Sequence, residues 1–122
     1  MTYLVVFDSD EWSVGQDVLV ASLAAEWPDA AIHRRQPPEG SKVRDIEWQL
    51  ERGGEQVEGH THVDGRCIYL DGDIGLVADL ALWYRKLVPK DIDVVFCDDG
   101  YSFDTTIDDT TTKDDLVAAS GA

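Results

Sequence analysis

Four aspartates placed directly after two apolar segments are the residues best suited to bind a metal ion. They are Asp8, Asp10, Asp98 and Asp99. The first two follow the run Tyr3–Phe7 and the other two follow Ile92–Cys97, and short β-prone apolar runs are typical of buried strands. If these strands are neighbours, the four carboxylates come close together and offer the oxygen ligands that Mg²⁺ and Ca²⁺ prefer. One hypothesis is therefore a metal-dependent enzyme or binding protein that uses this cluster.

The first aspartate pair also resembles part of the nucleophile loop of haloacid dehalogenase-type phosphatases. That loop has the pattern D-x-D-x-[T/V], and here Trp12 stands where the Thr or Val would be. The chain is also too short for the parallel sheet of that family, and the crossover helices of such a sheet are not predicted. The spacing therefore does not indicate a phosphatase.

Two further motifs with metal-ligating residues have simpler structural interpretations. The segment 71–75, DGDIG, imitates the start of a calcium loop but lacks the later ligands and the bidentate glutamate. Its residues Asp71 or Asp73 are better explained as N-terminal caps of the helix that follows. His60 and His62 share one face of a predicted strand, and without a third ligand they indicate an exposed strand face rather than a zinc site.

Nucleophilic catalysis finds no support in the sequence. Cys67 and Cys97 lie in apolar strands, where a thiolate is disfavoured, and we interpret both as reduced core cysteines. No serine lies in a G-x-S-x-G elbow, and no glycine-rich loop is present to hold phosphate. The sequence therefore predicts no catalytic residue and no cofactor.

A long apolar helix over residues 74–87 is the element around which we expect the chain to fold. Apolar residues recur at helical spacing at Leu76, Val77, Leu80, Trp83, Tyr84 and Leu87. Further apolar residues cover most of the remaining circumference, so the helix must pack on more than one side. Pro89 cannot continue the helix and ends it.

The flanking segments predict one α+β domain over residues 1–122. Strands are expected at 3–7, 30–35, 44–51, 55–62, 66–71 and 92–97, with hairpin turns at Gly53-Gly54 and Asp64-Gly65. A first helix begins with a capping box at Ser13 and carries an apolar stripe at Leu19, Val20, Leu23, Ala24 and Trp27. A last helix begins at Thr111 or Thr112, and Tyr101–Ile107 forms an additional edge strand.

The resulting order is β-α-β-β-β-β-α-β-α, with the edge strand before the last helix. It predicts a mostly antiparallel sheet packed against two to three helices. This arrangement is similar to a ferredoxin-like split β-α-β unit with an added strand.

Charge excludes several classes of partner. The net charge is −15, from 25 acidic and 10 basic residues, which is the reverse of the basic footprint that binding to nucleic acid or anionic membranes requires. The segment 91–122 contains nine acidic residues against Lys113 alone. No apolar run approaches the roughly 20 residues of a membrane span, and the first residues lack the basic segment of a signal peptide. We therefore expect a cytoplasmic protein.

A resemblance to a known class gives these features a function. Small, acidic, cysteine-poor α+β chains without an active site resemble bacterial immunity proteins of polymorphic-toxin and contact-dependent growth-inhibition systems. The stretch from Asp71 to Ile107 is similar to the end of bacterial proteins grouped with such genes, with LxWYRxLVP followed by FCDxGY. The resemblance implies no catalytic residues. It implies a tight one-to-one complex with a cognate toxin domain, whose active site or essential surface is blocked.

Basic toxin domains would associate fast with an acidic partner. The contact residues expected on this basis are Asp98, Asp99, Tyr101, Phe103, Asp104, Asp108 and Asp109. Tyr101 and Phe103 would be the aromatic anchors, although they could instead close the core under the last helix. Another alternative is a DNA-mimic inhibitor, whose carboxylates imitate the spacing of phosphates.

Overall fold

The computed structural model describes residues 2–7, 9, 16–34, 44–62, 67–100 and 102–121. The described elements are β1 (Thr2–Phe7), α1 (Gln16–Glu26), β2 (Ala31–Arg34), β3 (Arg44–Arg52), β4 (Glu55–His62), β5 (Cys67–Gly72), α2 (Ile74–Leu87), β6 (Val94–Asp98), β7 (Asp104–Ile107) and α3 (Lys113–Ala119). The strands form one sheet in the order β2-β3-β4-β5-β1-β6-β7, and every neighbouring pair is antiparallel. The predicted α+β domain with a mostly antiparallel sheet is therefore confirmed.

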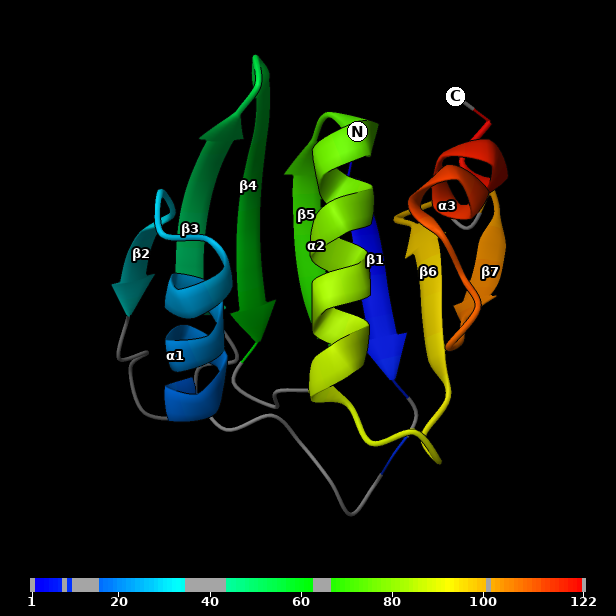
Figure 1. Ribbon diagram of the computed structural model, residues 1–122, viewed down its shortest axis with the longest axis horizontal. Coiled ribbons are helices and arrows are strands. Elements are labelled where there is room, and N and C mark those ends of the chain that lie inside the picture. The colour runs from blue at the N-terminus through cyan, green and yellow to red at the C-terminus, as the bar shows by residue number, and fades with distance from the viewer. Residues whose placement is uncertain are drawn as a thin grey trace.

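The helices α1, α2 and α3 all lie over the same face of the sheet, with α2 in the middle (Figure 1). We call this face the helix face and the opposite one the open face. In the part of the chain that the structure describes, no helix covers the open face. None of the described helices is long and apolar enough to cross a membrane.

A split β-α-β unit surrounds β1. The strands β5 and β6 lie on either side of β1 and are both antiparallel to it, so they are parallel to each other, and α2 joins them. The expected split unit is therefore present. The helix α1 instead connects β1 to β2, which lies at the far edge beyond β5, β4 and β3, so the sheet is larger than a split unit with one added strand.

Alternation along the strands separates core residues from surface residues. In β1, Tyr3, Val5 and Phe7 are buried beneath the helices, whereas the residues between them are partly exposed on the open face. The same alternation continues in β5, where Ile68 and Leu70 are fully buried. The hydrophobic core therefore lies mainly between the helix face and the helices, although Cys97, opposite Leu4 on the open face, is buried as well.

The predicted role of α2 as the central helix is confirmed. Its residues Leu80 and Trp83 are only 0% and 4% exposed. Trp83 Nε1 donates a hydrogen bond to Ser22 Oγ of α1 at 3.0 Å. On the other side, Lys113 Nζ of α3 lies 3.0 Å from a carboxylate oxygen of Asp79. The helix thus contacts the sheet and both neighbouring helices.

The N-terminus of α2 is capped differently from the expectation. Asp73 occupies the N-cap position, but its side chain makes no capping hydrogen bond and instead accepts one from the Gln56 amide at 2.9 Å. The carboxylate of Glu55, on β4, accepts from the Leu76 amide at 3.2 Å. A residue distant in sequence therefore satisfies a helix donor that local spacing assigned to Asp71 or Asp73.

Most predicted boundaries hold within a residue or two. The Gly53-Gly54 turn is present, and both glycines have positive φ, as a tight hairpin requires. The capping box of α3 is formed by Thr112 and Asp115. The edge strand begins at Asp104 rather than Tyr101. In α1, Ala24 is exposed, so the apolar stripe is narrower than predicted. Ser13 and the Asp64-Gly65 turn lie outside the described residues.

Candidate functional site

Acidic side chains gather on the open face of the sheet. Strand alternation places there Glu47 and Glu51 of β3, Glu58 of β4, Asp71 of β5 and Asp104 of β7. The register sets Glu58 directly opposite Asp71 on the neighbouring strand. Directly opposite residues share a face and have Cβ atoms roughly 4.5–5.5 Å apart, so like charges there repel.

The lysine and arginine side chains that the structure describes lie elsewhere. They are Arg52, Arg85, Lys86, Lys90 and Lys113. Arg52 lies over the ring of Trp27, 4.5 Å from its centroid. Arg85 donates hydrogen bonds to the carbonyls of Val88, Pro89 and Lys90 at the end of α2. Among described side chains, positive charge is therefore confined to the helix side of the molecule, and the open face carries carboxylates without lysine or arginine.

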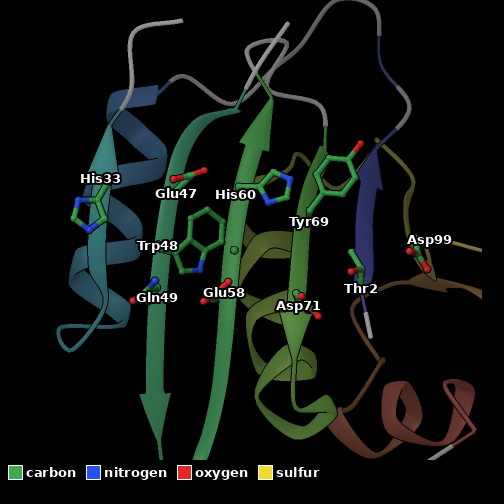
Figure 2. A pocket seen from close by; sticks show the side chains of 11 residues that line it. Thr2, His33, Glu47, Trp48, Gln49, Glu58, His60, Tyr69, Asp71 and Asp99 are labelled. Carbon is green, nitrogen blue, oxygen red and sulfur yellow. The ribbon is translucent and has the colours of Figure 1, made fainter.

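A hollow of about 410 Å³ lies on the open face where β3, β4 and β5 run side by side (Figure 2). Its lining residues are Thr2, His33, Glu47, Trp48, Gln49, Glu58, Gly59, His60, Tyr69, Asp71 and Asp99. His60 and Tyr69 are directly opposite each other, and their rings stack with centroids 4.6 Å apart and planes 6° apart. Glu58 and Asp71 lie two residues further along the same two strands. The hollow thus combines an aromatic wall with a carboxylate pair.

Asp98 lies at the end of β6, on the helix face, and is only 4% exposed. Its carboxylate accepts hydrogen bonds from the Ser102 hydroxyl and from the Ser102 amide, the latter at 2.7 Å. The Ser102 hydroxyl, followed by backbone amides, lowers the pKa of Asp98. The group therefore holds the loop between β6 and β7 and is not itself displayed to a partner.

The neighbouring predicted contact residues have different surroundings. Asp99 is exposed and lines the hollow, and Asp104 is exposed on the open face of β7. Phe103 is partly buried and packs against Tyr3 and Phe96, with ring centroids 6.2 and 5.5 Å apart. Phe103 thus helps to close the core, which was the alternative considered for it. Tyr101 lies outside the described residues.

Asp108 and Asp109 lie apart from the open face. Asp108 is exposed and accepts hydrogen bonds from the Thr110 amide and hydroxyl at 2.9 and 2.7 Å, which lower its pKa. Asp109 lies 3.9 Å from Lys90 Nζ. Both aspartates line a second hollow of about 340 Å³ together with Arg85 and other residues at the end of α2. The predicted C-terminal acidic surface is therefore divided between two regions.

The structure describes only two of the four residues of the hypothesised metal site, Asp8, Asp10, Asp98 and Asp99. Asp8 and Asp10 lie outside the described residues, and the carboxylate of Asp98 is engaged with Ser102. Within the described ranges, no group of three or more His, Cys, Asp or Glu side chains could hold a metal ion. His60 belongs to the aromatic wall of the hollow.

The two cysteines have different surroundings. Cys97 is buried, and burial, followed by the charges of Asp98 and Asp104, raises the pKa of its thiol. It fits the prediction of an unreactive core cysteine. Cys67 lies on the open face of β5 and is only partly buried, so the prediction of a core cysteine is wrong for it.

The open-face hollow itself was not predicted from the sequence, although His60, Asp71 and Asp99 were named there for other roles. The alternation of 44–51 and the pair of histidines on one strand indicated that these strands have an exposed face. They could not indicate that Glu58 meets Asp71 or that His60 meets Tyr69, because strand register depends on distant segments.

Comparison with known proteins does not assign the chain to a family. No protein-family model matches the chain, and no curated protein or solved structure matches it either.

Proposed function

We propose that this protein is an immunity protein, which binds a cognate bacterial toxin domain through an acidic surface and thereby neutralises it. The observation that supports this best is the sign of the charge on the open face, although the helix side carries carboxylates as well. Carboxylates gather on the open face, while every described lysine and arginine side chain lies on the helix side. A face of one sign attracts a partner of opposite sign and speeds encounter.

The surface proposed for this contact includes the exposed residues Asp99 and Asp104 of the C-terminal third. Asp98 supports this region from inside, because its hydrogen bonds to Ser102 hold the loop that follows Asp99. Asp108 and Asp109 lie near cations on the helix side, so we expect them to contribute less. The proposed site of action is the cytoplasm, where a toxin domain must be intercepted.

Co-expression with the toxin domain encoded next to the gene tests this function. Cells that carry the toxin should survive with this protein and die with an empty vector. Purified toxin should bind with an association rate that falls steeply as salt is raised, because screening weakens attraction between exposed charges. Replacing Asp99 and Asp104 by asparagine should slow association, whereas Asp108→Asn with Asp109→Asn should slow it less. Survival no better than the empty vector would refute the proposed function.

A further inference from the structure

The middle of the open face is apolar, although the strands around it are polar there. On β3, β4 and β7, the described side chains of this face are charged or polar, as expected for a sheet with one solvated face. The central strands β5, β1 and β6 instead carry apolar or aromatic side chains on both faces over most of their length. Six residues on the open face form what we call the apolar patch: Leu4, Val6, Cys67, Tyr69, Val95 and Cys97.

The strand register joins these side chains into one continuous surface. Leu4 of β1 lies directly opposite both Tyr69 of β5 and Cys97 of β6. Val6 lies directly opposite Val95, and opposite residues on one face have Cβ atoms roughly 4.5–5.5 Å apart. Leu4, Val6 and Val95 are partly exposed, and none of the described helices lies over them (Figure 1). Strands that are apolar on both faces are typical of sheets covered on both sides, so the patch is suited to a cover that the described elements do not supply.

Exposed carboxylates border the apolar patch. Asp71 lies directly opposite Thr2 at one end of it, and the Asp99 amide donates a hydrogen bond to the Thr2 carbonyl at 3.1 Å (Figure 2). Asp104 of β7 lies directly opposite Cys97 at its side. No described lysine or arginine side chain projects from this face. An apolar centre with a polar border is the anatomy of a protein–protein interface.

The charge of this border decides between two kinds of occupant. If two copies of the chain met through the apolar patch, the carboxylates of both borders would come together, and like charges brought together in an interface oppose binding. A different protein with lysine or arginine around an apolar centre would replace this repulsion by attraction. The border therefore disfavours a second copy and favours a basic partner.

We propose that the apolar patch is the centre of the docking surface for a protein partner, which covers it with an apolar or aromatic segment bordered by lysine or arginine. The inference rests on the proposed function for the identity of this partner, a toxin domain. It assigns different tasks to two sets of residues. The patch excludes water and sets the dissociation rate, whereas the bordering residues Asp99 and Asp104 attract the partner and set the association rate.

The first experiment uses three heptapeptides as probes: KKLWLKK, KKSSSKK and EELWLEE. Each is titrated into the full chain and read by backbone amide NMR at about 0.15 M salt. KKLWLKK should bind at least about tenfold more tightly than the other two, because only it combines apolar area with positive charge. It should shift the amides of β5, β1 and β6 around Leu4, Tyr69 and Val95. Equal affinity for KKLWLKK and either other peptide, or shifts centred outside these strands, would overturn the inference.

A pair of matched variants tests the patch itself. Val95→Thr exchanges a methyl group for a hydroxyl group within the patch and keeps a β-branched side chain suited to a strand. It should weaken binding of KKLWLKK by about fivefold. Val18→Thr makes the same exchange on α1, at a side chain that is 60% exposed, and should weaken binding by about twofold or less. Equal affinities of the two variants would refute a role of the patch. If Val95→Thr failed to fold, the peptide comparison on the parent chain would still decide.

The toxin domain encoded next to the gene separates this inference from the proposed function. In surface-plasmon measurements, Val95→Thr should speed dissociation, whereas Asp99→Asn with Asp104→Asn should slow association. If the parent neutralises the toxin and Val95→Thr dissociates from it no faster, the docking surface is wrong and the immunity function stands. If KKLWLKK binds to the patch but the parent neither binds nor neutralises the toxin, the immunity function is wrong and the docking surface stands.

Sedimentation of the full chain tests the excluded occupant. The parent should sediment as a monomer at neutral pH, because the acidic borders of two copies repel each other. A dimer that Val95→Thr dissociates and Val18→Thr does not would show that a second copy covers the patch, and it would overturn the inference of a basic partner.

Discussion

The two faces of the sheet are built from the same strands, but different physical causes explain which residues stand on each face. On the helix face, residues such as Val5, Ile68 and Leu70 are fully buried, and burial of apolar area explains their identity. On the open face, the pairing of Glu58 with Asp71 opposes folding, since like charges repel across the strands. Burial of apolar area therefore explains the residues of the helix face, but it does not explain these two carboxylates.

The largest expected effect comes from the helix face. Leu80 is fully buried in α2, and Leu80→Ala should cost about 2–5 kcal/mol of unfolding free energy, because it leaves a cavity in the core. Leu4→Ala removes the same atoms from the open face of β1, where the side chain is partly exposed. Its cost in a urea melt should be clearly smaller. Equal losses of stability in the two variants would contradict the difference in burial between the helix face and the open face.

A second prediction concerns the tight packing within the helix face. Gly59 of β4 lies against the buried indole of Trp48, and an added Cβ would overlap that ring. Gly59→Ala should therefore cost about 1–3 kcal/mol, as overpacked core substitutions do. At Gly100 an added Cβ would meet no atom within 4 Å, so Gly100→Ala should change stability by about 0.5 kcal/mol or less. Comparison of the two denaturation midpoints would check the prediction, and a neutral Gly59→Ala would contradict it.

A third prediction concerns Asp98, a charged residue on the helix face, and the dependence of stability on pH. The pKa of Asp98 is lowered by Ser102 in the folded state, so its ionised form stabilises the fold above its unfolded-state pKa, near 4. That contribution is lost as the pH falls through the lower folded-state pKa. Asp98→Asn should therefore be less stable than the parent at neutral pH, and the difference should shrink in acid.

Asp99→Asn is the matched control for this experiment, because it removes the neighbouring charge at an exposed position. It should leave the urea midpoint nearly unchanged at both pH values. A difference between Asp98→Asn and the parent that stayed constant from neutral to acidic pH would contradict the role assigned to Ser102.

The sequence predicted the helix face better than the open face for a physical reason. Burial imposes a period on local sequence, so α2 and the alternating strands could be recognised from residues such as Leu80 and Trp83. The open face obeys no such constraint, and its arrangement depends on which strands become neighbours. The same limit explains Glu55, whose capping of α2 depends on a contact between residues 21 positions apart.

The C-terminal acids show the same limit for the candidate site. Sequence proximity grouped Asp98, Asp99, Asp104, Asp108 and Asp109 into one surface. In the fold, the register places Asp98 opposite Tyr3 on the helix face and Asp104 opposite Cys97 on the open face, while Asp109 lies near Lys90. Charge counts along a chain therefore give the sign of the charge, but they do not predict on which surface it lies.

The smallest predicted effect has the opposite sign and tests the open face directly. Glu58→Gln keeps the size of an exposed side chain and removes one charge of the pair formed with Asp71. Relief of cross-strand repulsion should raise the unfolding free energy by about 0.2–1 kcal/mol at low salt, and screening should reduce the gain as salt is added. Glu51→Gln is the control, because its directly opposite residue is the uncharged Gln56; thermal melts of both variants at two salt concentrations would measure the difference. A loss of stability in Glu58→Gln would show that this carboxylate stabilises the fold, and would contradict a repulsive pairing of Glu58 with Asp71 on the open face.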